Sequence, residues 1–84
     1  MPVVLISKSA RLGRNDVMDV RYGTAMDDPK PFILSVTAEH ILYQTQAAPP
    51  FSYYQMKAYV DNNAEKLKTI AEACIARGLK AETL

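Results

Sequence analysis

The sequence predicts an α+β domain, in which a three-stranded, mainly antiparallel sheet is packed on one face by a short and a long helix in the order β-β-β-α-α. Two runs of strict apolar–polar alternation, at 17–22 and 32–37, indicate half-buried strands. Apolar residues then recur at helical spacing over 52–78. The 84 residues leave room for a single domain, 1–84. Residues 79–84 either add a fourth strand or fray.

The N-terminal segment contains the continuous apolar run Val3-Val4-Leu5-Ile6. Such a run is typical of a strand that is buried on both faces, or of one that pairs with another subunit. Residues 8–16 follow with a polar stretch around a central glycine, which predicts a loop.

The two alternating runs predict an antiparallel hairpin. Their apolar faces consist of Met18, Val20 and Tyr22 in the first run and Phe32, Leu34 and Val36 in the second. Acidic residues, a glycine and two prolines between the runs supply turn chemistry. Asp27 and Asp28 are therefore interpreted as turn residues and not as metal ligands.

Two helices are expected to cover the hairpin. Thr37 is suited to cap a short helix over 38–45. Ser52 and Gln55 have the spacing of a capping box, and Gly78 suits the position just after a helix end. We expect one long helix between them, bent at 61–63 where Asp and Asn weaken it, and prefer this to two helices.

Composition excludes several classes of protein. The chain is 49% hydrophobic and 23% charged, which excludes a disordered chain, and its net charge of +1 argues against nucleic-acid binding. Its single cysteine cannot form an internal disulfide. No run is long enough for a signal peptide or a membrane span. We therefore expect a soluble protein of the cytoplasm.

No combination of residues predicts catalysis or metal binding. The only histidine, His40, is expected to face solvent on the short helix, and the only cysteine, Cys74, falls on the apolar stripe of the long helix and is expected in the core. Neither has the partners that a catalytic pair or a closed zinc site requires. We expect no enzyme, no cofactor and no metal.

Two sets of residues are candidates for binding. The possible interface consists of Val4, Ile6, Phe51, Tyr53 and Tyr54, because apolar strands and tyrosines are common where proteins associate. For the aromatic residues, packing between helix and sheet is the preferred alternative. The possible anion contact consists of Lys8, Arg11 and Arg14, for which a solvated loop is preferred.

One family resembles this chain in its motifs. The segment Val36-Thr37-Ala38-Glu39-His40-Ile41-Leu42, followed by a helix that carries Tyr59-Val60-Asp61-Asn62-Asn63 and Ile70-Ala71, is similar to the bacterial family called domain of unknown function 1488. The resemblance covers residues 17 to about 77. It implies a small α+β cytoplasmic protein and assigns no activity, so no site residue is carried over.

The apolar N-terminal strand, the long helix and the tyrosines together offer more apolar surface than one small sheet covers. We therefore expect a non-enzymatic interaction protein that self-associates, as a homodimer. The alternative is a small ligand- or nucleic-acid-binding module that uses the basic loop 8–14.

Overall fold

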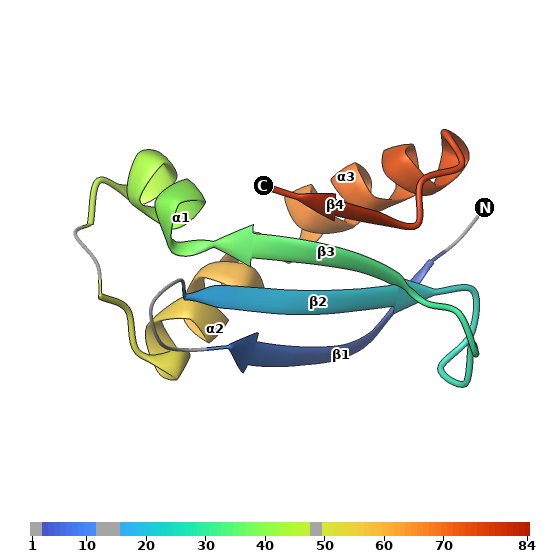
Figure 1. Ribbon diagram of the computed structural model, residues 1–84, viewed down its shortest axis with the longest axis horizontal. Coiled ribbons are helices and arrows are strands. Elements are labelled where there is room, and N and C mark those ends of the chain that lie inside the picture. Colours follow the sequence, from blue (N-terminus) through green and yellow to red (C-terminus); the bar gives the residue numbers. More distant parts are fainter. Residues whose placement is uncertain (1–2, 12–15, 48–49) are drawn as a thin grey trace.

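The computed structural model describes residues 3–11, 16–47 and 50–84, and they form a four-stranded mixed sheet with three helices (Figure 1). The elements are β1 (Val4–Arg11), β2 (Val17–Gly23), β3 (Phe32–Thr37), α1 (Ala38–Thr45), α2 (Tyr53–Asn62), α3 (Ala64–Ala76) and β4 (Ala81–Thr83). The strands lie in the order β1-β2-β3-β4, antiparallel except for the β3–β4 pair, which is parallel. The predicted α+β class is confirmed.

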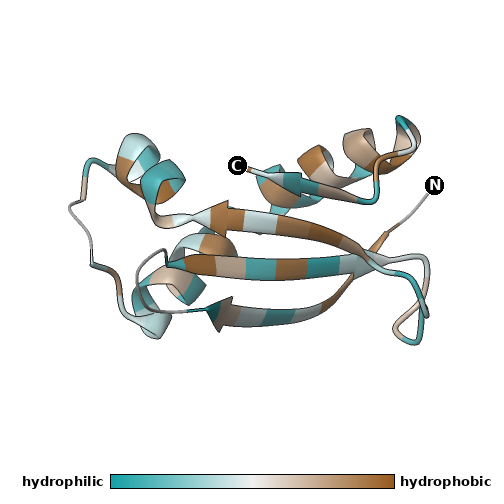
Figure 2. Ribbon diagram, in the orientation of Figure 1, coloured by the Kyte–Doolittle hydropathy of each residue, from teal (hydrophilic) through white to brown (hydrophobic). Residues whose placement is uncertain are grey.

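The predicted hairpin is present as β2 and β3. Met18 pairs with Val36, Val20 with Leu34 and Tyr22 with Phe32, so the apolar faces of both strands coincide. Figure 2 shows hydrophobic and hydrophilic residues alternating along β2, whereas the first half of β3 is hydrophobic throughout. The alternating pattern therefore fixes which face of the sheet is buried.

The prediction of a loop over 8–16 is wrong for its first part. β1 continues to Arg11, and Lys8, Ser9 and Ala10 pair with β2 within the same chain. The segment has too few apolar residues for its alternation to be recognised as a strand, and the neighbouring β2 determines its conformation. The expected burial on both faces is also wrong beyond Val3, because Val4 and Leu5 are 37% and 41% exposed.

The preferred single long helix is replaced by two helices, α2 and α3, which meet at Asn63. The backbone of Asn63 leaves helical geometry, with φ −118° and ψ 24°, and its side-chain amide donates a hydrogen bond to the carbonyl oxygen of Tyr59 at 2.8 Å. Asparagine competes for helical carbonyls in this way. The break lies inside the predicted weak segment.

Both ends of the 52–78 region match the prediction. Ser52 and Gln55 form a complete capping box at the start of α2. At the end of α3, Gly78 has φ 81° and donates to the carbonyl of Ile75, while the amide of Leu79 donates to that of Cys74. This pair of bonds is a Schellman motif, which satisfies the last carbonyls of the helix.

The short helix and the fourth strand complete the fold. Thr37 caps α1 by accepting a hydrogen bond from the amide of His40 at 3.1 Å. Within residues 79–84, Ala81–Thr83 form the strand β4, which pairs with β3 from Ile33 to Ser35.

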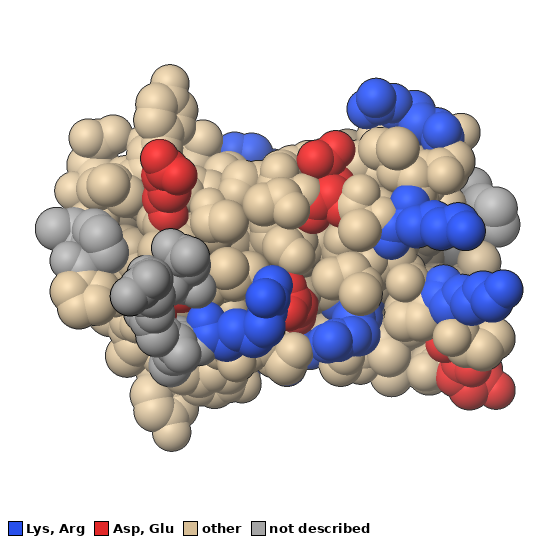
Figure 3. Space-filling model, in the orientation of Figure 1, with Lys and Arg blue, Asp and Glu red and all other residues tan. Residues whose placement is uncertain are grey.

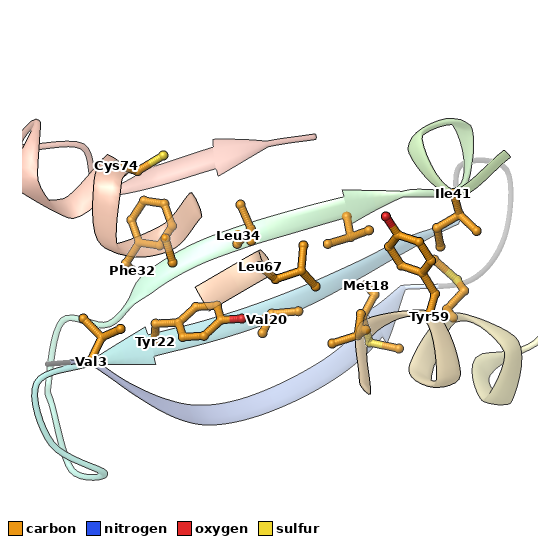
Figure 4. Packing of buried hydrophobic residues seen from close by; sticks show 14 of the residues in the cluster. Val3, Met18, Val20, Tyr22, Phe32, Leu34, Ile41, Tyr59, Leu67 and Cys74 are labelled. Atoms are coloured by element: carbon orange, nitrogen blue, oxygen red, sulfur yellow. The ribbon is translucent and has the colours of Figure 1, made fainter. Parts of the chain in front are cut away.

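The core lies between the sheet and the helices, and Figure 4 shows its side chains converging there. It includes Val3, Met18, Val20, Tyr22, Phe32, Leu34, Val36, Ile41, Phe51, Met56, Tyr59, Val60, Leu67, Ala71 and Cys74. The expectation that Cys74 is a core residue is confirmed. None of the helices in the described part of the chain has the length and apolar character that crossing a bilayer requires.

Candidate functional site

In the part of the chain that the structure describes, β1 forms the longer of the two free edges of the sheet. β1 is the outermost strand, and over its eight residues the sheet pairs it with β2 alone. The opposite edge is β4, which has three residues. An edge strand presents unpaired N–H and C=O groups that are a template for another strand. β1 offers that template over nearly three times the length of β4.

The start of this edge is apolar and partly exposed. Val4 and Leu5 expose 37% and 41% of their surface. Ile6 is half-buried at a shift in register between Leu5 and Ser7, and its Cδ1 lies only 2.8 Å from where a Cβ on Gly23 would stand. Of the two strand residues predicted at an interface, Val4 therefore lies on the exposed edge, whereas Ile6 packs against the end of β2.

The predicted aromatic residues do not join this edge. Figure 1 shows the start of α2 at the opposite end of the sheet from the start of β1. Phe51 is 6% exposed and belongs to the core, as the preferred alternative stated. Tyr53 is half-buried and meets Tyr54 edge to face, with ring centroids 5.6 Å apart. Tyr54 projects into solvent with 79% of its surface exposed.

The predicted basic cluster is not one site. Lys8 and Arg11 lie on opposite faces of the sheet: Lys8 pairs with Asp61 of α2, and Arg11 pairs with Asp19 of β2. Asp61 also accepts a hydrogen bond from Lys57 at 2.7 Å. Arg14 lies outside the described residues. The charges of Lys8 and Arg11 are therefore already engaged within the fold.

Asp19 is the one buried charged side chain recorded in the described residues. Its carboxylate accepts hydrogen bonds from Arg11 Nε at 2.8 Å, Arg11 Nη2 at 3.2 Å and Ser35 Oγ at 2.8 Å. Burial acts to raise the pKa of Asp19, but the hydrogen bonds from Arg11 and Ser35 and the charges of Arg11 and Arg21 outweigh it and hold that pKa below its ordinary value. The group ties β1, β2 and β3 together on the face away from the core.

His40 does not face solvent as expected. It is half-buried, and its Nε2 lies 2.9 Å from the hydroxyl oxygen of Tyr59, with the rings edge to face. Burial and the nearby charge of Lys66 lower the pKa of His40. The contact joins α1 to α2 and gives the histidine a structural role. Among the residues that the structure describes, no group of three His, Cys, Asp or Glu side chains is placed to hold a metal ion.

Sequence reasoning missed a cavity of about 320 Å³ at the end of the sheet, between the β2–β3 loop and the turn from α3 to β4. Its walls include Tyr22 and Phe32 from neighbouring strands, and Lys30 and Lys80 from the two connecting segments. Lys80 is 50 positions from Lys30 in the sequence, so no local motif could have indicated that they line one cavity.

No protein-family model, no curated protein and no solved structure matches this chain. The similarity to domain of unknown function 1488 therefore stays a prediction, and the site has to be interpreted from its own geometry.

Proposed function

We propose that this protein is a non-enzymatic interaction protein of the cytoplasm that self-associates as a homodimer, by pairing the free edges of two β1 strands. The observation that carries the proposal is the length of β1, eight residues at the outside of the sheet, next to exposed apolar side chains. The buried free thiol of Cys74 is consistent with a reducing compartment.

The unequal edges of the sheet favour a closed dimer. A strand pairs with its own copy in antiparallel fashion about a twofold axis, which makes the same patch meet itself and ends assembly at two chains. Pairing of β1 with β4 of the next copy would instead build an open filament. β4 has three residues against the eight of β1, so that pairing could use only a small part of the edge.

Side chains on β1 are compatible with such pairing. Charged residues commonly protect edge strands, yet Lys8 is only 19% exposed in its side chain and is bound to Asp61. The register shift after Leu5 disturbs the edge near its start. We expect the new pairing to use the regular part from Ser7 to Arg11 together with the exposed Val4 and Leu5 at the start of the strand.

The test is the mass of the particle at micromolar concentration, measured by sedimentation equilibrium. We expect twice the chain mass of 9.4 kDa for the natural sequence. The double variant Val4→Lys/Leu5→Lys places two charges at the edge and should give a single chain. The matched control Tyr43→Lys/Tyr54→Lys makes the same charge change at two residues that are 76% and 79% exposed, and should stay dimeric.

A natural chain that remains monomeric up to about 100 µM, where even weak specific pairs associate, contradicts self-association. Loss of the dimer in the tyrosine variant alone contradicts the assignment to β1. The alternative of a basic binding loop has no comparable support, because Lys8 and Arg11 are paired within the chain and lie on opposite faces.

A further inference from the structure

The cavity at the end of the sheet has an apolar interior. Tyr22 and Phe32 pair across β2 and β3 at this point, and Ile75 and Leu79 come from α3 and the turn after it. The volume of about 320 Å³ is at the lower end of the range for small-molecule sites. An aromatic ring or a branched apolar group of similar size would be removed from water there.

Two lysines give the cavity a positive side. Lys30 and Lys80 line it from the β2–β3 loop and from the turn before β4, and within the described residues neither ammonium group has a recorded ion-pair partner. Lys8, Lys57 and Arg11, by contrast, are each paired with an aspartate. Figure 3 shows that basic side chains gather at this end of the molecule.

The one acidic side chain in the lining is already engaged. The carboxylate of Asp28 accepts hydrogen bonds from the amide and hydroxyl of Thr24, at 3.1 and 3.3 Å, and from the amide of Lys30 at 2.9 Å. The backbone bonds from Lys30 and Thr24 hold the pKa of Asp28 below its ordinary value. Asp28 therefore folds the loop, and two lysines against one aspartate leave the lining with a charge of +1.

Two of the carbonyl groups at the end of α3 are already engaged in hydrogen bonds. The Schellman motif occupies the carbonyl oxygens of Cys74 and Ile75 with the amides of Leu79 and Gly78 at 3.0 and 2.9 Å. The negative end of the helix dipole is partly neutralised in this way.

We propose that this cavity binds a small organic carboxylate with an aromatic or branched apolar body, which lies between Tyr22, Phe32 and Leu79 while the carboxylate reaches Lys30 and Lys80. This class of ligand satisfies the two features that the cavity combines, an apolar interior and two lysines in the lining that have no recorded ion-pair partner among the described residues. The inference is independent of self-association, because the lining includes no residue of β1.

The experiment is a titration of the full chain with 3-phenylpropionate, followed by the amide NMR signals of Gly23, Thr24 and Lys80. We expect saturable shifts at these amides. The uncharged 3-phenylpropan-1-ol, which has the same apolar body, should bind about tenfold more weakly, since each of the two exposed charge contacts contributes up to ~1 kcal/mol.

The double variant Lys30→Gln/Lys80→Gln should weaken 3-phenylpropionate binding by about tenfold for the same reason, and both residues are exposed enough for the fold to tolerate the change. The control Lys66→Gln/Lys68→Gln removes two charges from α3 outside the cavity and should leave the affinity unchanged. Three results would overturn the proposal: no saturation up to about 10 mM ligand, equal binding of the alcohol, or equal effects of the two lysine pairs.

Discussion

Single residues in this fold carry out tasks that their neighbours cannot share. Asp19 joins three strands through Arg11 and Ser35, and His40 joins two helices through Tyr59. Gly23 is the clearest case of a steric requirement. A Cβ at this position would lie 2.8 Å from both Asp28 Cβ and Ile6 Cδ1, closer than packed carbon atoms approach. Asp28 of the β2–β3 loop and Ile6 of β1 can therefore pack this closely against residue 23 only because it is a glycine.

Gly23→Ala is expected to lower the free energy of unfolding by about 1–3 kcal/mol, because a methyl group forces packed atoms apart. Urea denaturation measures the change. Gly78→Ala is the informative comparison: nothing lies within 4 Å of its added Cβ, but its φ of 81° is unfavourable for alanine. That variant should lose about 1 kcal/mol through backbone conformation alone. If Gly23→Ala were as stable as the natural chain, the close packing around Gly23 would be refuted.

At the scale of secondary-structure elements, the sequence predicts those elements whose own residues form a recognisable pattern. The alternation in β2 and β3 and the caps at Thr37 and Ser52 are local, and the structure reproduces them. Beyond Ser7, Ala10 is the only apolar residue of β1, so the strand conformation there comes from pairing with β2. The change of helix axis at Asn63 leaves the apolar repeat uninterrupted, because Val60 and Leu67 stay buried on either side of it. Periodicity cannot report such a break.

The capping box of α2 gives a prediction for that element. Ser52 accepts from the amide of Gln55 at 3.2 Å, and its own amide donates to the Gln55 side chain at 2.7 Å. Ser52→Ala removes the acceptor and should reduce stability by about 1 kcal/mol, whereas Ser52→Asp retains a capping oxygen and should change it little. The midpoints of urea unfolding compare the two. Equal losses in both variants would show that the serine contributes in some other way.

For the whole molecule, two features depend on residues far apart in the chain and could not be predicted from the sequence. The cavity is lined by residues of β2, the β2–β3 loop, β3, α3 and the turn before β4, and the free edge of β1 follows from the position of β4 on the other side of the sheet. The separation of Val4 from Tyr54 is equally a matter of topology. Val4 and Tyr54 are both interface candidates because of their residue types. Only the positions of β1 and α2 in the fold show that they lie apart.

The stability of the whole fold should decrease as the pH falls below about 6.5, the ordinary pKa of histidine. Because the pKa of His40 is lowered in the folded protein by burial and by Lys66, the unfolded chain binds more protons between that folded value and 6.5. The stability that His40 contributes is therefore fully present above this pH window, and it is lost as the pH falls through the window. Below about pH 4 a further loss follows, since the pKa values of Asp19, Asp28 and Asp61 are also lowered.

Thermal melts between about pH 7.5 and 3 check this expectation. His40 is the only histidine in the chain, so His40→Asn should flatten the dependence above pH 5 and leave the acid loss in place. An unchanged slope in that variant would assign the effect to other groups.

The parallel pairing of β4 with β3 has a consequence for how the protein is made. Residues 81–83 align with residues 33–35, so nearly fifty amino acids are added by the ribosome between the two partners. As long as a nascent chain lacks residues 81–83, β3 has no neighbouring strand on its outer side. Both edges of the incomplete sheet then consist of long strands that are unpaired on their outer sides, and the outer side of β3 is one margin of the sheet. Pairing of those three residues with β3 replaces this margin by an edge only three residues long, so that β1 is left as the longer of the two edges.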